Sequence, residues 1–335
     1  MTAPLLTVKD LVVEYPIKGF RAKPFRALKG VSLDIRPGEC VGLVGESGSG
    51  KTTLGRAVLG LAPVTEGSIT LHGEEIGNIS ARRRREIGKD VQVVFQDPYT
   101  SLNPAMTIEA ILSEPLLARR VPRVDEEGLF EQPPSAQKMP EMDEETLVEP
   151  PPTRKMSKAE ARERVANLLE EVRLPADAMH RLPREFSGGQ RQRIAIARAL
   201  ALDPELIICD EPVSALDLST QARVLDLFKE IQDRTKVAYL FITHDLDVVR
   251  HISHRVAVMW KGEIVEAGDT AEVTCRPEHP YTQRLWMAAP VADPVKQKIR
   301  REDRRQLLAA QAIAEEEAAR EATVAGAPAL ATAAG

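Results

Sequence analysis

The chain contains short stretches made almost entirely of apolar residues, and segments in which apolar residues recur at helical spacing lie between them. Short, near-continuous apolar runs are typical of parallel strands that are covered on both faces. Three such runs occupy residues 91–95, 206–209 and 237–242. Strands of this kind that alternate with helices predict an α/β core with a parallel sheet built from βαβ units.

The first third of the chain has a different pattern. Residues 5–15 alternate between apolar and polar positions, as a strand with one buried face does. Two short apolar runs, 31–35 and 40–44, follow, and Pro37 and Gly38 separate them. Because Pro and Gly favour turns, we predict strands joined by turns in this region.

The middle of the chain is helical, most clearly at residues 108–117 and 159–172, and we place a helical subdomain at about 97–186. Residues from about 120 to 157 interrupt it and are rich in Pro, Asp and Glu. Such a composition buries too little apolar surface to offset the entropy lost on ordering. We predict an unfolded acidic insertion there, with a partner-binding segment as the alternative.

The overall length and composition fit one large α/β domain with appendages, since the chain has 335 residues and is 43% apolar. We expect this composite domain to occupy residues 1–290. The remaining residues, 291–335, are charged and then rich in Ala, which predicts a solvated helix that frays into a disordered tail.

Charge and cysteine usage narrow the class of protein. A formal net charge of −5 argues against a chain held on nucleic acid by its overall field, because phosphate binding depends on clustered Lys and Arg. Cys40, Cys209 and Cys275 are far apart, which favours a reducing cytosol over a disulfide framework. The start lacks a signal-peptide pattern, and no apolar run approaches the roughly 18 residues of a membrane span. A partner chain would supply any spans.

A glycine-rich segment lies between the apolar run 40–44 and a helical pattern at 52–61. It fits G-x-x-x-x-G-K-[ST], with Gly45, Glu46, Ser47, Gly48, Ser49, Gly50, Lys51 and Thr52, and Thr53 follows. The backbone N–H groups of such a phosphate loop point at phosphate oxygens, and the helix N-terminus adds partial positive charge. We expect Lys51 to neutralise the β and γ phosphates of ATP and Thr52 to bind Mg²⁺. A turn that merely caps a helix is the alternative.

Asp210 and Glu211 directly follow the apolar run 206–209, so both are expected at the carboxyl edge of the sheet, where α/β proteins bind ligands. Asp210 is then placed for the magnesium shell. Glu211 is the candidate to orient and polarise the attacking water. Without the phosphate loop, a solvated acidic pair would be the better interpretation.

A second glycine-rich helix start consists of Ser187, Gly188, Gly189 and Gln190 and precedes a helical pattern at 191–201. Its N-terminus suits an anion. One phosphate loop already serves one nucleotide, so this site would serve another nucleotide or another face of the same one; an ordinary helix cap is the alternative. The segment FSGGQRQRIAIARAL resembles the signature of ABC ATPases. In that family it caps the γ-phosphate of the nucleotide held by the opposite cassette.

Other motifs extend the resemblance over about residues 5–294, apart from the insertion. Gln96 matches the Q-loop glutamine, which in the family touches the magnesium and water region and senses the membrane partner. The sequence SALD at 214–217 matches the D-loop, and His244 matches the switch histidine that hydrogen-bonds the γ-phosphate. Tyr15 lies where the family has an aromatic ring that stacks on adenine, although a Tyr packed on an edge strand is the alternative.

The resemblance implies a P-loop NTPase fold of the RecA-like type, with an antiparallel β subdomain and the inserted helical subdomain. It also implies ATP and Mg²⁺ as ligands, with Thr52, Gln96 and Asp210 near the metal. Phe186 stands where many cassettes have Leu, an apolar exchange that should not affect phosphate chemistry. Some relatives bind an iron–sulfur cluster near the C-terminal segment through several cysteines, but here only Cys275 is present, so we predict no cluster.

Three segments resemble, within this family, the ATPase subunits of oligopeptide and dipeptide importers: LGRAVLGL, FQDPYTSLNP and HPYTQRLWMAAPVADP. They are similar in particular to the second of the two ATPases that such importers often carry. The resemblance implies a peripheral subunit on the cytoplasmic face of the membrane. Its partners would be a similar second ATPase, most simply in a heterodimer although a homodimer is possible, two permeases and, indirectly, an extracytoplasmic solute-binding protein. Peptide as the cargo rests on analogy alone, since related importers move nickel complexes, glutathione or peptide antibiotics.

Three other functions are weighed against the importer: the ATPase of an exporter, a soluble ABC ATPase acting on nucleic acid or ribosomes, and a cassette that no longer hydrolyses ATP. The soluble class usually has two cassettes in one chain or a long coiled-coil insertion, whereas this chain has one cassette and no sustained heptads. Intact Lys51, Asp210, Glu211 and His244 oppose the inactive cassette.

Overall fold

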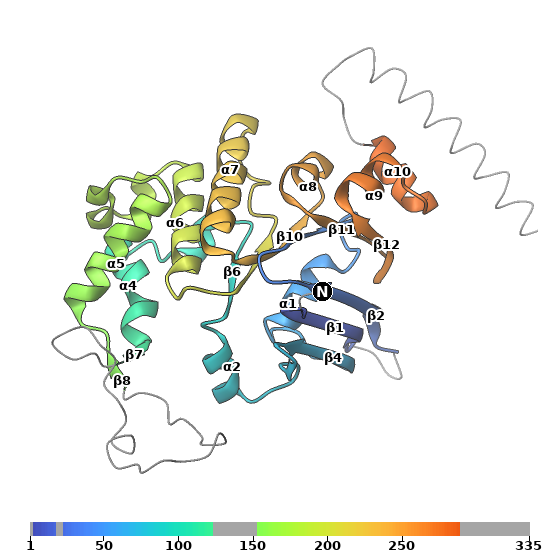
Figure 1. The fold of residues 1–335 in the computed structure, drawn as a ribbon, viewed down its shortest axis with the longest axis horizontal. Coiled ribbons are helices and arrows are strands. Elements are labelled where there is room, and N and C mark those ends of the chain that lie inside the picture. The colour runs from blue at the N-terminus through green and yellow to red at the C-terminus, as the bar shows by residue number, and fades with distance from the viewer. Residues whose placement is uncertain (1–2, 18–22, 123–152, 289–335) are drawn as a thin grey trace, which may run out of the picture.

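The computed structural model describes residues 3–17, 23–122 and 153–288. A six-stranded sheet lies at the centre, with a helical subdomain at one end and a second sheet at the other (Figure 1). The strands of the central sheet are, in spatial order, β12 (Glu263–Asp269), β11 (Arg255–Trp260), β3 (Cys40–Val44), β10 (Ala238–Thr243), β9 (Leu206–Asp210) and β6 (Val91–Val94). All neighbours are parallel except the edge pair β11 and β12. The three apolar runs are therefore parallel strands, as the sequence predicts.

The strands of this sheet are apolar throughout because their alternating side chains enter two different cores. In β10, Tyr239 and Phe241 pack in the core that includes the helical subdomain. Leu240 and Ile242 pack in the core that the central sheet shares with the antiparallel sheet. Every residue of β10 is buried, so neither face of this strand needs polar side chains.

The second sheet is antiparallel and has the order β2 (Phe25–Ile35), β1 (Leu6–Tyr15), β4 (Glu66–Leu71) and β5 (Glu74–Glu75). Helix α1 (Lys51–Val58) contacts β2 of this sheet and β9 and β10 of the central sheet. It therefore ties the two sheets together directly after the phosphate loop. Helix α2 (Ala81–Ile87) follows β5. The strands predicted for the first third of the chain are confirmed.

The helical subdomain contains α3 (Pro98–Ser101), α4 (Ile108–Ala118), α5 (Lys158–Glu171), two 3₁₀ helices (Ala176–His180 and Pro183–Glu185) and α6 (Gly188–Leu200). It lies on the side of the central sheet away from β1 and β2 (Figure 1). Its apolar side chains and those of α7 (Leu218–Thr235) share one core. The predicted boundaries of about 97–186 enclose the helices of this subdomain except α6, which lies beyond the predicted end.

Helices begin where the sequence supplies a side-chain oxygen to accept a free backbone N–H. Two of these starts, Ser157 before α5 and Ser187 before α6, form reciprocal capping boxes with Glu160 and Gln190. The residues that cap a helix in this way are Ser80, Asp97, Thr107, Ser157, Ser187, Asp217, Asp245 and Asp269.

Ordered structure extends into both edges of the predicted acidic insertion. Strand β7 (Arg120–Pro122) pairs antiparallel with β8 (Thr153–Lys155), so Pro122 and Thr153 lie opposite each other. The composition argument missed this ladder because backbone hydrogen bonds hold it and its three residues per strand carry no visible pattern. The rest of the predicted insertion, residues 123–152, lies outside the described residues, as does the predicted tail at 291–335.

The β7–β8 ladder makes the insertion testable. Because Pro122 and Thr153 are neighbours across the ladder, a short Gly/Ser linker can join them in place of residues 123–152. We expect this replacement to change Tm by less than about 2 °C in a thermal unfolding experiment. A decrease in Tm of more than about 5 °C would show that the segment packs on the domain and would contradict the predicted unfolded insertion.

The C-terminal part of the described chain contains α8 (Leu246–Ile252), α9 (Thr270–Cys275) and α10 (Pro280–Ala288). The last two pack beside β11 and β12 around a third apolar core that includes Val44, Tyr281 and Trp286. Cys40 and Cys209 are buried as free thiols, and burial raises the pKa of the Cys40 thiol to about 12, which keeps it unreactive.

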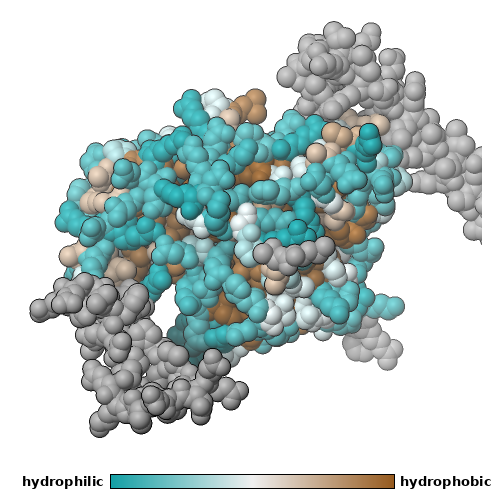
Figure 2. Space-filling view, in the orientation of Figure 1, coloured by the Kyte–Doolittle hydropathy of each residue, from teal (hydrophilic) through white to brown (hydrophobic). Residues whose placement is uncertain are grey.

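The face shown in Figure 2 is mostly hydrophilic, with apolar residues visible in small separate patches. In the described part of the chain, the helices are too short or too polar for any of them to cross a membrane.

Candidate functional site

The phosphate loop lies between β3 and α1, and Gly50 caps the helix with a left-handed backbone, φ 111°, that favours glycine. The ammonium of Lys51 folds back over the loop, where its Nζ donates to the carbonyl oxygens of Gly45 at 2.8 Å and Glu46 at 2.9 Å. The residue is only 5% exposed. These carbonyls hold the Lys51 ammonium beside the backbone N–H groups of the loop.

Burial lowers the pKa of Lys51 from its ordinary value, because the charged ammonium loses hydration. The negative charges of Glu211, Asp210 and Glu46 act in the opposite direction. A desolvated ammonium is stabilised by direct contact with an anion. The phosphate groups of a bound nucleotide would supply such a contact to Lys51.

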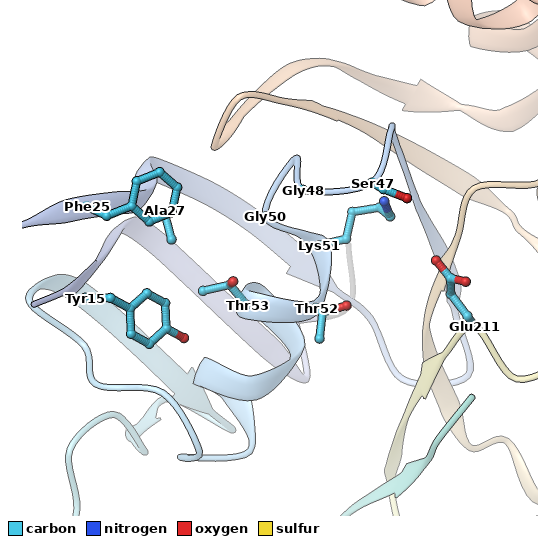
Figure 3. Close-up of a pocket in the computed structure, with 10 residues that line it drawn as sticks. All are labelled: Tyr15, Phe25, Ala27, Ser47, Gly48, Gly50, Lys51, Thr52, Thr53 and Glu211. Atoms are coloured by element: carbon cyan, nitrogen blue, oxygen red, sulfur yellow. The ribbon is translucent and has the colours of Figure 1, made fainter. Parts of the chain in front are cut away.

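A cavity of about 430 Å³ opens beside the loop (Figure 3). Tyr15 and Phe25 lie at one end of it, Glu211 at the other, and Lys51 and Thr52 between them. The residues that line it are Tyr15, Phe25, Ala27, Ser47, Gly48, Gly50, Lys51, Thr52, Thr53 and Glu211. The cavity thus has an aromatic end and a charged end, and its volume suits a small molecule of nucleotide size.

Phe25 is a member of the site that the sequence reasoning missed. It is 57% exposed at the start of β2 and lies directly opposite Tyr15 in the β1–β2 ladder. An exposed aromatic at the start of a predicted strand, opposite another aromatic, is the signal that could have found it, because cross-strand neighbours share one face. Ala27, also in β2, was missed for lack of any chemical signal.

Thr52 lines the cavity and contacts Asp210, which lies outside the lining. The Thr52 hydroxyl donates to Oδ1 of Asp210 at 3.1 Å. Burial raises the pKa of Asp210 above its usual value, and the hydrogen bond from Thr52 opposes this shift. Mg²⁺ prefers oxygen ligands, and it often takes only one or two from the protein while phosphates and waters complete its coordination shell. The neighbouring oxygens of Thr52 and Asp210 fit that ion.

Glu211 and His244 form a second pair at the carboxyl edge of the sheet. His244 Nδ1 lies 3.2 Å from Oε2 of Glu211. The Glu211 backbone has φ 50°, the left-handed region, and its N–H donates to the carbonyl of Ile242 at 2.9 Å. A non-glycine residue in this region is strained by about 1–3 kcal/mol, and such strain is common at functional sites.

Asp210 and His244 lie outside the cavity lining but contact Thr52 and Glu211, which line it. The remaining predicted site residues also lie outside the lining. Gln96 is exposed just after β6 at the edge of the sheet. Ser187 and Gln190 cap each other at the start of α6. Gly188 lies against Leu216, just before α7, and Gly189 lies against Thr220, in the first turn of α7. Gly45, Glu46 and Ser49 belong to the phosphate loop without lining the cavity. The structure therefore gathers the loop, Asp210, Glu211 and His244, but not Gln96 or residues 187–190.

Comparison with protein families decides the class of this chain. Residues 28–214 match the family described as ABC transporter. The chain belongs to the ABC transporter ATP-binding family. The predicted P-loop NTPase fold with an antiparallel β subdomain and an inserted helical subdomain is thereby confirmed.

Two solved cassettes share the fold. The dimeric structure of the ATP-binding cassette MJ0796 bound to ADP and Pi is 26% identical with a TM-score of 0.60, and the match covers 79% of this chain and 98% of that one. The structure of cbiO1 from Clostridium perfringens is 24% identical with a TM-score of 0.63, over 84% and 95% of the two chains, and it supports the fold alone.

Similar curated proteins are named as ATP-binding proteins of transport or import. The oligopeptide transport ATP-binding protein AmiF of Streptococcus pneumoniae is 43% identical over 88% of this chain and 84% of its own length. The glutathione import ATP-binding protein GsiA of Pectobacterium atrosepticum is 43% identical over 87% of this chain. The match covers only 42% of the length of GsiA.

Proposed function

We propose that this ABC cassette binds Mg·ATP and hydrolyses it to power the import of peptides or a related small solute through separate permease chains. The observation that carries the proposal is the single cavity that brings together the phosphate loop, Glu211 and a pair of aromatic rings. The names of two similar proteins, a putative peptide import and a glutathione import ATP-binding protein, support import as the process. A third relative is named as an oligopeptide transport ATP-binding protein.

The phosphate end of the cavity acts by charge and position. Lys51 exchanges the carbonyls of Gly45 and Glu46 for oxygens of the β and γ phosphates, and the N–H groups of the loop and of the start of α1 surround the same phosphates. Thr52 and Asp210 would hold Mg²⁺, and the bound ion would supply positive charge near the phosphate oxygens. At the opposite end, the rings of Tyr15 and Phe25 offer apolar faces to the adenine.

Glu211 is placed to act on the attacking water. A water between its carboxylate and the γ-phosphate is oriented for in-line attack. The carboxylate accepts a proton as the bond from the γ-phosphorus to the water oxygen forms, while the bond from the γ-phosphorus to the bridging oxygen breaks and ADP leaves. His244 contacts Glu211 through Nδ1. Donation from its other ring nitrogen to the γ-phosphate requires a proton on that nitrogen, which in a neutral ring means that Nδ1 no longer donates to Glu211. Gln96 lies outside the cavity, so its role in sensing the metal or the permease requires a movement or a partner.

The site of one chain is incomplete for this chemistry, because residues 187–190 of the same chain do not line the cavity. In our proposal the start of α6 from a second, similar cassette closes the cavity over the γ-phosphate, and both cassettes sit on the cytoplasmic face of two permeases. The dimeric MJ0796 cassette, which carries ADP and Pi, supports such an assembly. A heterodimer, a solute-binding protein and peptide as the cargo are further parts of the proposal, and neighbouring genes for these components would test them.

Substitution of Lys51 tests nucleotide binding. We expect Lys51→Ala to weaken ATP binding by about tenfold to a hundredfold, because a charge-assisted contact contributes about 1.5–3 kcal/mol. Calorimetric titration with Mg·ATP measures the affinity. Lys158→Ala, which removes the same charge from the exposed first turn of α5, serves as the control and should bind ATP normally. Unchanged affinity in Lys51→Ala would contradict the assignment of the loop.

A further inference from the structure

The last described helix, α10, places a side chain behind the phosphate loop. The backbone N–H of Glu46 donates to the hydroxyl oxygen of Tyr281 at 3.0 Å, a contact between residues 235 positions apart in sequence. Tyr281 is only 3% exposed, and its ring stacks on Trp260 with 5.4 Å between centroids. The hydroxyl is thus held in place by a buried ring rather than by a mobile surface side chain.

The start of α10 is held in place by contacts of the HPYT segment at 279–282, which does not line the nucleotide cavity. Nδ1 of His279 accepts the backbone N–H of Tyr281 at 3.1 Å. The carboxylate of Glu266, in β12, accepts the backbone N–H groups of Glu278 at 2.9 Å and His279 at 3.0 Å. These contacts anchor the turn before α10 to the central sheet, so the Tyr281 hydroxyl has a defined position relative to β3.

A second contact from the same region holds the other end of the loop. The N–H of Gly262, in the turn between β11 and β12, donates to the carbonyl of Ser49 at 2.9 Å. Gly45 lies so close to this strand that an added Cβ would meet the carbonyl oxygen of Met259 at 2.1 Å. Strand β11, the turn after it and α10 therefore contact the phosphate loop and support its conformation.

The Tyr281 contact continues to the lysine of the site. Glu46, whose N–H donates to Tyr281, accepts from Lys51 Nζ through its carbonyl at 2.9 Å. A change at the Tyr281 hydroxyl therefore moves an acceptor of the Lys51 ammonium. Burial raises the pKa of Tyr281, so the hydroxyl stays protonated and uncharged at neutral pH.

We propose that Tyr281 is a positioning residue whose hydroxyl fixes Glu46 and keeps the phosphate loop in the shape that receives nucleotide. The proposal rests on the function proposed above, since it concerns the same site. Without the hydroxyl, the Glu46 N–H loses its acceptor and the empty loop takes other conformations. Nucleotide binding must then restore the shape, so affinity falls while the chemistry at Glu211 is little affected.

Tyr281→Phe tests this, because it removes one oxygen and keeps the ring that stacks on Trp260. We expect the Kd and KM for Mg·ATP to rise by about threefold to tenfold, with kcat changed by less than about twofold. Thr282→Val is the matched control. It removes a hydroxyl from the next residue of α10, which is fully buried and whose oxygen has no hydrogen-bond partner among the described residues.

Three measurements on the full chain decide the matter: the Kd by calorimetry, the split of kcat and KM, and Tm. A weaker Kd in Tyr281→Phe alone, at a Tm equal to that of Thr282→Val, supports the proposal. An unchanged Kd, or equal weakening in both variants, would show a purely structural role and overturn it. The wild-type chain separates this from the proposed function: if it fails to bind ATP, the proposed function fails, whereas normal binding in both wild type and Tyr281→Phe refutes only the role of Tyr281.

Discussion

Glu211→Gln should slow ATP hydrolysis by about two to four orders of magnitude while ATP affinity stays nearly unchanged, because general-base catalysis contributes about that much. Gln has the size of Glu and keeps a hydrogen bond to water or His244, but it cannot accept the proton. The backbone around it should not change, since the left-handed φ of 50° and the N–H contact to Ile242 do not involve the carboxylate.

The measurement is phosphate release and ATP affinity in the assembly with the partner chain. With hydrolysis blocked, the closed assembly should also persist in the presence of ATP, which gel filtration detects as a larger species. Glu205→Gln, just before β9 at the other end of the same strand, is the control for the loss of one carboxylate. Hydrolysis near the wild-type rate in Glu211→Gln would remove Glu211 from its proposed role.

The meeting of Glu211 and His244 shows what sequence patterns predict well. Each residue follows a run of apolar residues, and these runs form the neighbouring parallel strands β9 and β10, with Asp210 opposite Ile242. Parallel strands end at the same edge, so side chains that follow them directly must be near one another. The pattern thus predicts the strands and the sheet edge at which Asp210 and Glu211 lie, while the pairing of β9 with β10 and the 3.2 Å contact come from the structure.

Contacts between segments without a shared pattern could not be predicted. Strand β12 is partly exposed along its whole length, so its sequence shows neither an apolar run nor a clear alternation. The contact of Tyr281 with Glu46 depends on how Glu266 of β12 holds the turn before α10, and local periodicity contains no information about that contact. The unpredicted parts are therefore those that support the phosphate loop from behind and not the loop itself.

Ser187→Arg should abolish hydrolysis at the phosphate loop of the partner cassette, by about two to three orders of magnitude, while nucleotide binding at its own loop remains. The reason is geometric. Residues 187–190 lie outside the cavity of their own chain, so in the proposed assembly they contact the γ-phosphate that the partner cassette binds. A long cationic side chain at this helix start would occupy the space in which the γ-phosphate of the partner is proposed to lie.

Loss of the helix cap is the competing explanation, because Ser187 accepts the N–H of Gln190 in a capping box and its replacement destabilises α6 by about 0.5–2 kcal/mol. Ser157→Arg controls for this, since Ser157 forms the same capping box with Glu160 at the start of α5. Each variant is combined with Lys51→Ala in this chain, or with the equivalent substitution in the partner, so that one phosphate loop works at a time. If residues 187–190 serve the opposite nucleotide, Ser187→Arg inactivates only the assembly in which the partner's loop is the working one, and Ser157→Arg inactivates neither. A defect that follows the mutated chain's own loop would mean that each cassette completes its own site, and the proposed sandwich would have to be abandoned.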